Sequence, residues 1–155
     1  MRICIVSVGK QMPAWVEQAF QAYQKRLPSR FQLQLTEVPA GRRTKGADLV
    51  RISREETKRI LAAVPDGYRI IALERTGKTM TSTQLAAAMK DYMNNGENLA
   101  IITGGPEGLD DECLEKANEV WSLSALTLAH PVVRVVLAEQ LYRAWSIIQN
   151  HPYHR

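Results

Sequence analysis

The chain has 155 residues, of which 45% are hydrophobic, and this is enough apolar material for the core of one domain. No apolar run approaches the roughly 20 residues that cross a bilayer, and the first ten residues lack the pattern of a signal peptide. We therefore expect a single cytoplasmic domain over residues 1–155 that contacts no membrane. The net charge of +4 permits an anionic partner without requiring one.

Strands and helices alternate in the first half of the chain. The pattern predicts a buried strand over 2–8, a helix over 13–27, a half-exposed strand over 31–36 and a charged helix over 48–63. Between the last two, residues 39–46 combine loop-forming residues with three cations. The two cysteines, Cys4 and Cys113, form no CxxC pair and have no histidine at metal-ligand spacing, so we interpret them as buried thiols and expect no metal site.

The same alternation continues in the second half. We expect a strand around 70–73, a helix over 81–94, a strand over 99–103, a helix over 110–118, an apolar, hydroxyl-rich segment over 121–128 and a final helix from His130-Pro131. Thr81 and Gln84 have the spacing of a capping box. Strands that alternate with helices predict an α/β fold with a mostly parallel sheet and helices on both faces.

The final helix carries more apolar residues than a surface helix of a monomer needs. They are Val132, Val135, Val136, Ala138, Leu141, Tyr142 and Trp145. This width predicts a surface for a partner subunit.

Three loops follow apolar strand patterns, and ligands of parallel sheets gather at the carboxyl ends of strands. The loops are Glu74–Lys78, Gly104–Gly108 and Ser124–Leu128. We expect them to line one pocket, in which a side chain added at Gly105 would obstruct the approach of a ligand to the backbone. The glycine loop suits a nucleoside or a carboxylate, although a structural turn would use the same residues. It matches neither the dinucleotide fingerprint nor a P-loop, which disfavours nucleoside triphosphate hydrolysis.

All three histidines lie in the C-terminal stretch, together with Arg134, Arg143, Tyr153 and Arg155. This composition fits two interpretations. The stretch can be a solvated chain end, or it can hydrogen-bond phosphates and stack on bases. The residues alone leave that choice open.

Several motifs recur in order along the chain. They are Val8-Gly9-Lys10 with Met12-Pro13, Val38-Pro39-Ala40-Gly41, Gly104-Gly-Pro-Glu-Gly-Leu109, Trp121-Ser-Leu-Ser-Ala-Leu-Thr-Leu128, His130-Pro131, Leu141-Tyr-Arg-Ala-Trp145 and Asn150-His-Pro-Tyr-His-Arg155. On these motifs the chain resembles the ribosomal large-subunit methyltransferase H family, which belongs to the SPOUT class.

The resemblance implies a fold and an activity. The fold is an α/β domain with a C-terminal trefoil knot, an exception to the rule that chains do not thread loops, and it forms a homodimer. The activity is transfer of a methyl group from S-adenosylmethionine to N3 of pseudouridine 1915 in 23S rRNA, within helix 69 of assembled ribosomes. No metal takes part.

The resemblance also assigns residues. The residues implied to bind the methyl donor are Leu73, Gly104, Gly105, Ser124, Ala125, Leu126, Thr127, Leu128 and Ala129. Those implied to act on the RNA are Arg143, Tyr153, His154 and Arg155, with His154 as the candidate proton acceptor and an arginine to stabilise the anion on the base. Ala129 departs from the family pattern, which has proline before His130-Pro131.

Two rival functions remain open from the sequence. The first is an RNA-binding module without catalysis, whose glycine loop is only a turn. The second is another S-adenosylmethionine-dependent RNA methyltransferase of the same fold that acts on ribose or on tRNA. Binding of S-adenosylmethionine would distinguish an enzyme from the first rival, which has no need of a methyl donor. The Asn150–Arg155 tail argues against the second rival.

Overall fold

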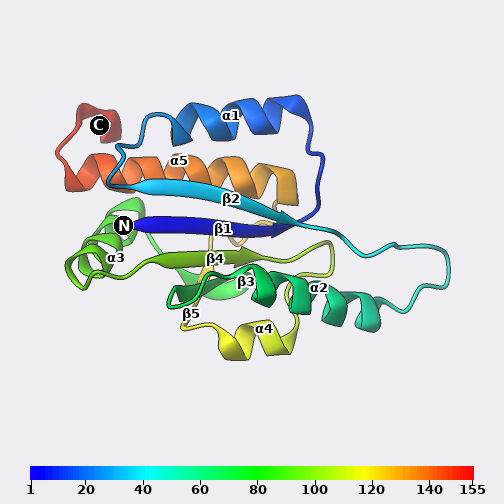
Figure 1. Cartoon of the computed structure of the whole chain (residues 1–155). Coiled ribbons are helices and arrows are strands. Elements are labelled where there is room, and N and C mark those ends of the chain that lie inside the picture. Colours follow the sequence, from blue (N-terminus) through cyan, green and yellow to red (C-terminus); the bar gives the residue numbers. More distant parts are fainter.

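The computed structural model of the chain describes residues 1–155 and contains one sheet of five parallel strands in the order β2-β1-β4-β3-β5 (Figure 1). The strands are β1 (Arg2–Val8), β2 (Gln32–Val38), β3 (Arg69–Thr79), β4 (Leu99–Thr103) and β5 (Glu119–Ser122). The helices are α1 (Ala14–Gln24), α2 (Leu49–Ala63), α3 (Ser82–Asn94), α4 (Asp111–Lys116), α5 (His130–Ile148) and the short 3-10 helix η1 (Pro152–His154). The predicted α/β class with a parallel sheet is confirmed.

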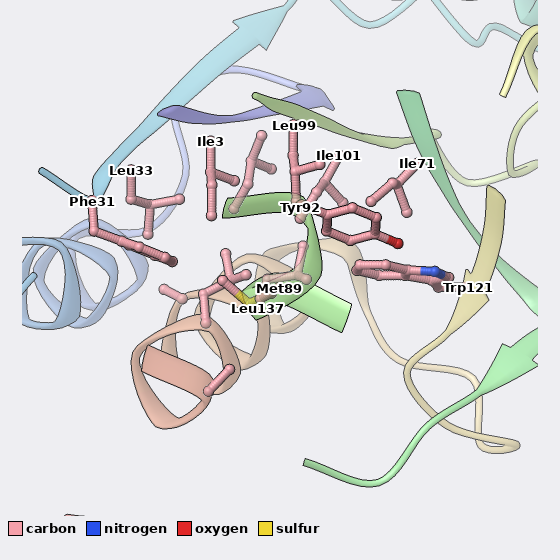
Figure 2. Packing of buried hydrophobic residues seen from close by; sticks show 14 of the residues in the cluster. Ile3, Phe31, Leu33, Ile71, Met89, Tyr92, Leu99, Ile101, Trp121 and Leu137 are labelled. Carbon is pink, nitrogen blue, oxygen red and sulfur yellow. The ribbon is translucent and has the colours of Figure 1, made fainter. Parts of the chain in front are cut away.

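Helices cover both faces of the sheet because every central strand is apolar on both sides. On one face, α1, α3 and α5 pack on a cluster that includes Ile3, Ile101 and Leu137; Figure 2 shows these side chains pointing toward one another. On the other face, α2 and α4 pack on a second cluster that contains both free cysteines, Cys4 and Cys113. The prediction of buried thiols is therefore confirmed. None of the helices combines the length and hydropathy needed to span a bilayer.

The helix starts follow from local hydrogen bonds. Asp48 precedes α2, and its side chain accepts a hydrogen bond from the backbone N–H of Arg51. Thr81 and Gln84 form the predicted capping box at the start of α3, with both reciprocal bonds present. Such caps satisfy backbone N–H groups that have no partner within the helix.

Strand β3 is longer than predicted. The sequence suggests a short strand that ends in a loop at Glu74, but β3 continues to Thr79. The pairing shifts on the way, since Leu73 and Lys78 both lie opposite Trp121 and the residues between them bulge out of the ladder. The sequence Gly-Lys-Thr ends a P-loop at the start of a helix. In this chain Gly77-Lys78-Thr79 lies in strand β3, so it does not form a P-loop.

Helix α5 lies between α1 and α3 on the sheet. Ala138, Leu141 and Tyr142 are consequently buried within the chain itself. The apolar width of this helix is therefore explained in part by the core of one chain, and the partner surface stays a prediction. Val132 and Val135 remain half-buried.

The buried side chain of Arg134 links helix α5 to the sheet. This side chain is 1% exposed, and its Nη2 atom donates to the carbonyl oxygens of Val8 at 3.1 Å and Gly9 at 2.8 Å, where β1 ends. Nη1 pairs with the carboxylate of Glu37 at the end of β2. Sequence reasoning groups Arg134 with the cations of the C-terminal stretch, as solvated or RNA-binding. Both assignments are wrong for this residue, because its side chain is buried and Nη1 and Nη2 bond groups inside the fold.

We predict that Arg134→Met destabilises the protein by about 3 kcal/mol, because it leaves two buried carbonyl groups and Glu37 without their donor. Urea denaturation monitored by circular dichroism measures the difference. Arg51→Met is the matched control, since the Arg51 side chain is 77% exposed and its pair with Glu55 is worth at most about 1 kcal/mol. Equal stability of the two variants would contradict the importance of Arg134.

Candidate active site

A cleft of about 780 Å³ opens at the carboxyl ends of β3, β4 and β5. Its walls are the bulged part of β3 at Glu74 and Arg75, the loops that follow β4 and β5, and the start of α5. The lining residues are Leu73, Glu74, Arg75, Thr103, Gly104, Gly105, Pro106, Glu107, Gly108, Ser122, Leu123, Ser124, Leu126, Thr127, Leu128, Ala129, His130 and Val133. The prediction that these three segments line one pocket is thus confirmed, but the first of them is a bulge within β3 and not a loop, and only Glu74 and Arg75 of it line the cleft.

The structure places the predicted donor residues together. All nine except Ala125 line the cleft. Sequence reasoning missed Thr103 and Ser122, which are the last residues of β4 and β5, and also His130 and Val133 of α5. Thr103 and Ser122 could have been predicted from the rule that ligands gather at the carboxyl ends of strands. No sequence pattern predicts that the first turn of α5 lines the cleft.

The glycine loop is a tight turn. The N–H of Gly108 donates to the carbonyl of Gly105 at 2.9 Å, and the two residues form an isolated bridge. A side chain at Gly104 would overlap the backbone of Gly108, so the chain can close here only with glycine. Glycine at position 104 is therefore required by the closure of the turn itself.

Gly105 behaves differently from the expectation. A Cβ atom there would lie 3.0 Å from Oε2 of Glu56 and 3.2 Å from Nη2 of Arg43, and neither residue lines the cleft. The expectation that a side chain at Gly105 would obstruct the cleft itself is therefore wrong. It would press instead on an ion pair behind the loop.

The loop after β5 is shaped by its hydroxyl groups. Ser122 donates to the carbonyl oxygen of Ser124 at 3.1 Å, and the Ser124 hydroxyl accepts from the N–H of Leu126 at 2.9 Å. Leu126 is 75% exposed at the rim of the cleft. An exposed leucine held on a fixed turn offers an apolar contact to a flat ligand.

His130 connects this loop to α5. Its Nδ1 atom is buried and has no hydrogen-bond partner. Burial lowers the pKa of His130 below its usual value of 6.5, and the nearby charge of Arg134 lowers the pKa further. The imidazole at the cleft is therefore neutral at pH 7.

The predicted RNA-acting residues lie away from the cleft. None of Arg143, Tyr153, His154 and Arg155 lines it. His130 borders the cleft at the start of α5, and the tail follows the other end of this helix, which is 19 residues or about 28 Å long. Figure 1 shows the C-terminus at the opposite end of α5 from the β4–α4 connection. Within one chain, cleft and tail are separate sites.

The tail is packed and not a loose chain end. Glu139 accepts hydrogen bonds from Arg143 at 2.6 Å and from the Tyr153 hydroxyl at 3.1 Å. The Tyr153 ring lies edge-on to Tyr142 at 4.7 Å, and the Arg143 guanidinium lies 5.0 Å from the Tyr153 ring centre. Burial, with the hydrogen bonds to Tyr23 and Glu139, raises the pKa of Tyr153, so its hydroxyl stays protonated at neutral pH.

Comparison with known proteins identifies the family. A family model described as "Predicted SPOUT methyltransferase" matches residues 1–154. The chain is also 49% identical over 155 residues to Ribosomal RNA large subunit methyltransferase H of Thioalkalivibrio sulfidiphilus (strain HL-EbGR7), covering 100% of this chain and 99% of that protein. The chain belongs to the SPOUT methyltransferase family. The likeness to the ribosomal large-subunit methyltransferase H family, first seen in short motifs, thus extends over the whole chain.

Solved structures share the fold of this SPOUT methyltransferase at low identity. A probable methyltransferase from Bordetella pertussis Tohama I superposes with a TM-score of 0.58 at 16% identity, covering 92% of this chain and 93% of that one. TrmJ from Z. mobilis ZM4 superposes with a TM-score of 0.56 at 17% identity, covering 93% and 70%. These likenesses show the fold alone.

In this SPOUT methyltransferase, the cleft and the tail lie at opposite ends of α5. The tail, which contains His151, His154 and Arg155, follows the end away from the cleft. Which residues contact the donor and which act on the RNA stays a prediction.

We predict that the neutral state of His130 makes folding sensitive to acid. Its pKa is lowered in the folded chain, so its contribution to stability is complete above about pH 6.5, the unfolded pKa, and is lost as the pH falls through the folded value. Urea denaturation at pH 7.5 and pH 5.5 should show a larger loss of stability for the parent protein than for His130→Gln. Parallel losses in the two proteins would contradict the prediction, because all other titrating groups are shared.

Proposed function

We propose that this chain transfers a methyl group from S-adenosylmethionine to N3 of pseudouridine 1915 in 23S rRNA, in helix 69 of assembled cytoplasmic ribosomes, and that it works as a homodimer with a knotted C-terminal region. One observation carries the proposal. The relative that is 49% identical over the full length of this chain is named for methylation of large-subunit ribosomal RNA. The cleft and the tail support it independently.

The cleft suits the proposed donor. Its volume of about 780 Å³ lies in the range of small-molecule sites, roughly 300–1,000 Å³. Gly104 leaves backbone open to the ligand, Leu126 and Leu128 offer apolar contact to an adenine ring, and Thr127 offers a hydroxyl. Bound there, S-adenosylmethionine would supply an electrophilic methyl group. The protein's own contribution is to hold the donor for an in-line displacement.

A basic surface near the cleft suits RNA phosphates. The loop between β2 and α2 projects past the carboxyl edge of the sheet (Figure 1). This loop and α2 carry four exposed cations that form no ion pair, namely Arg42, Lys45, Arg54 and Lys58. The ion pairs of this region use other arginines, so these four are free to contact phosphate.

The tail suits the chemistry on the base. Methylation at N3 requires loss of the N3 proton, and His154 is the proposed acceptor because an imidazole titrates near neutral pH. Its Nδ1 atom is buried without a partner in the chain, so the proposed acceptor is its other ring nitrogen. Arg155 is exposed and is the proposed stabiliser of the anion on the base. Arg143 is held by Glu139, so its proposed contribution is to orient Tyr153 rather than to reach the base itself.

A homodimer reconciles the two separate sites. The tail does not reach its own cleft, so we propose that it completes the cleft of the partner subunit. The proposed interface contains the half-buried Val132, Val135 and Val136 at the start of α5 and Trp15 of α1, which is 53% exposed. A symmetric interface of this kind would create two composite sites.

We predict that the purified protein methylates assembled ribosomes from a strain lacking this modification. Transfer of labelled methyl groups is measured, and mass spectrometry of rRNA fragments locates the product. Leu126→Glu should weaken donor binding at least tenfold, about 1.4 kcal/mol, because it places a charge where an apolar ring would lie. Leu49→Glu changes another exposed leucine away from the cleft and is the control for donor binding. Methylation of ribose or of tRNA instead would favour the rival enzyme, and absence of donor binding would favour the non-catalytic module.

A second prediction concerns the composite site. Deletion of Tyr153–Arg155 should abolish methyl transfer and leave donor affinity unchanged. An equal mixture of this deletion with Leu126→Glu should regain about one quarter of the parent activity after subunit exchange, because half of the dimers then hold one intact site. Light scattering checks that each variant is a dimer. The assay uses a donor concentration well below the Kd of Leu126→Glu, so that this variant alone has little activity. A mixture no more active than its components would contradict completion of the cleft by the partner.

A further inference from the structure

Arg43 joins three parts of the molecule that the proposed function uses separately. It lies in the basic loop, and its guanidinium contacts Glu56 of α2 and Glu107 of the glycine loop. Nη1 and Nη2 bond Glu56 at 2.8 and 3.1 Å, and Nε bonds both oxygens of Glu107 at 3.2 and 3.0 Å. Nη2 also pairs with Glu107, and Nη1 reaches the Gly41 carbonyl at 3.1 Å. Every N–H group of Arg43 is therefore used.

Glu56 fixes Arg43 from behind. The Glu56 side chain is 4% exposed and also accepts a hydrogen bond from the N–H of Gly41 at 2.8 Å. A buried carboxylate needs a charged partner, and Arg43 is the only cation paired with it. The guanidinium is thereby held in one orientation, with its remaining edge directed at Glu107.

Neutralising Glu56 does not by itself explain the arrangement. One carboxylate would satisfy that need, yet Arg43 also makes a bidentate contact with Glu107, which has no other cation partner and lines the cleft. The hydrogen bonds from Arg43 lower the pKa of Glu107, so this contact stays ionic at neutral pH. Through Glu107, Arg43 is therefore connected to a residue of the cleft wall.

Glu107 lies at the tip of the turn that Gly104 and Gly108 close. The base of this turn is fixed by the bond between Gly108 and Gly105, whereas the tip has Arg43 as its only side-chain partner. Gly105 packs directly on the Arg43–Glu56 pair, as its tight Cβ position shows. The turn therefore contacts the Arg43–Glu56 ion pair at Gly105 and contacts Arg43 again at Glu107.

We propose that Arg43 is a positioning residue that holds the glycine loop in the shape that binds the methyl donor, and that ties this loop to the basic loop. The inference rests on the proposed function for the identity of the donor. Arg43 itself contacts neither the donor nor the RNA. Its effect passes through Glu107.

The test measures S-adenosylmethionine affinity by calorimetry in Arg43→Gln, Glu107→Gln and the double variant. Arg43→Gln should raise Kd and the KM for the donor about tenfold, with kcat on ribosomes within about twofold at saturating donor. Glu107→Gln should act in the same direction, and the double variant should bind no more weakly than Arg43→Gln, because both changes break one link. Arg43→Lys should keep only part of the affinity, since an ammonium group carries its three donors on one atom and cannot reproduce the bidentate contacts of the guanidinium. Arg51→Gln is the control, because Arg51 pairs with Glu55 outside the cleft.

Hydrogen exchange of the ligand-free protein provides a readout that does not need the donor. Arg43→Gln should speed exchange at the amides of Gly105 and Gly108, while amides of the central strand β4 remain protected. Additive effects on Kd would overturn the proposal in favour of direct contact between Glu107 and the donor. A loss of stability with unchanged Kd and unchanged exchange would show a structural contribution alone. If the parent protein bound no donor, the proposed function would fail, and the exchange data would still decide the positioning effect.

Discussion

The attachment of α5 to the carboxyl edge of the sheet governs the rest of this structure. Arg134 makes that attachment from within the helix, through the carbonyl groups of Val8 and Gly9 and the carboxylate of Glu37. It fixes where α5 begins and therefore places His130 beside the bulge of β3 and the loops after β4 and β5. The same attachment directs the far end of α5, and the tail that follows it, away from the cleft. One buried arginine thus places the start of α5 at the cleft, and the length of the helix sets the distance to the tail.

The separation of cleft and tail has a consequence for how so small a chain can act on RNA. Proposed donor binding uses loops whose backbone approaches closely, and proposed proton removal uses titratable side chains at the chain end. Placing these at opposite ends of α5 lets each be built independently. A pair of chains is then the simplest way to bring them together, and the half-buried valines of α5 offer apolar surface for it.

The cations of the chain fall into two groups, those paired with carboxylates and those left exposed. Arg134, Arg43 and Arg143 are committed to Glu37, to Glu56 with Glu107, and to Glu139. Exposed cations on α2, such as Arg54 and Lys58, are left free for phosphate. The basic composition of the chain therefore overstates the cations available to RNA, because several arginines stabilise the fold or the loops instead. Counting charges in the sequence does not distinguish these groups.

The sequence determined the features that depend on neighbours along the chain. Apolar runs and alternation predicted the strands, the Thr81–Gln84 spacing predicted a cap, and the rule for parallel strands predicted one pocket from three loops. Linked motifs also identified the family that the full-length comparison supports. Only the tertiary structure decided what depends on distant contacts. It buried Arg134, turned the Cβ position of Gly105 toward Arg43, extended β3 through a bulge and placed the tail a helix length from the cleft. The physical reason is that local patterns record periodicity and turn chemistry, whereas the partner of a buried charge lies on an element that only packing brings near.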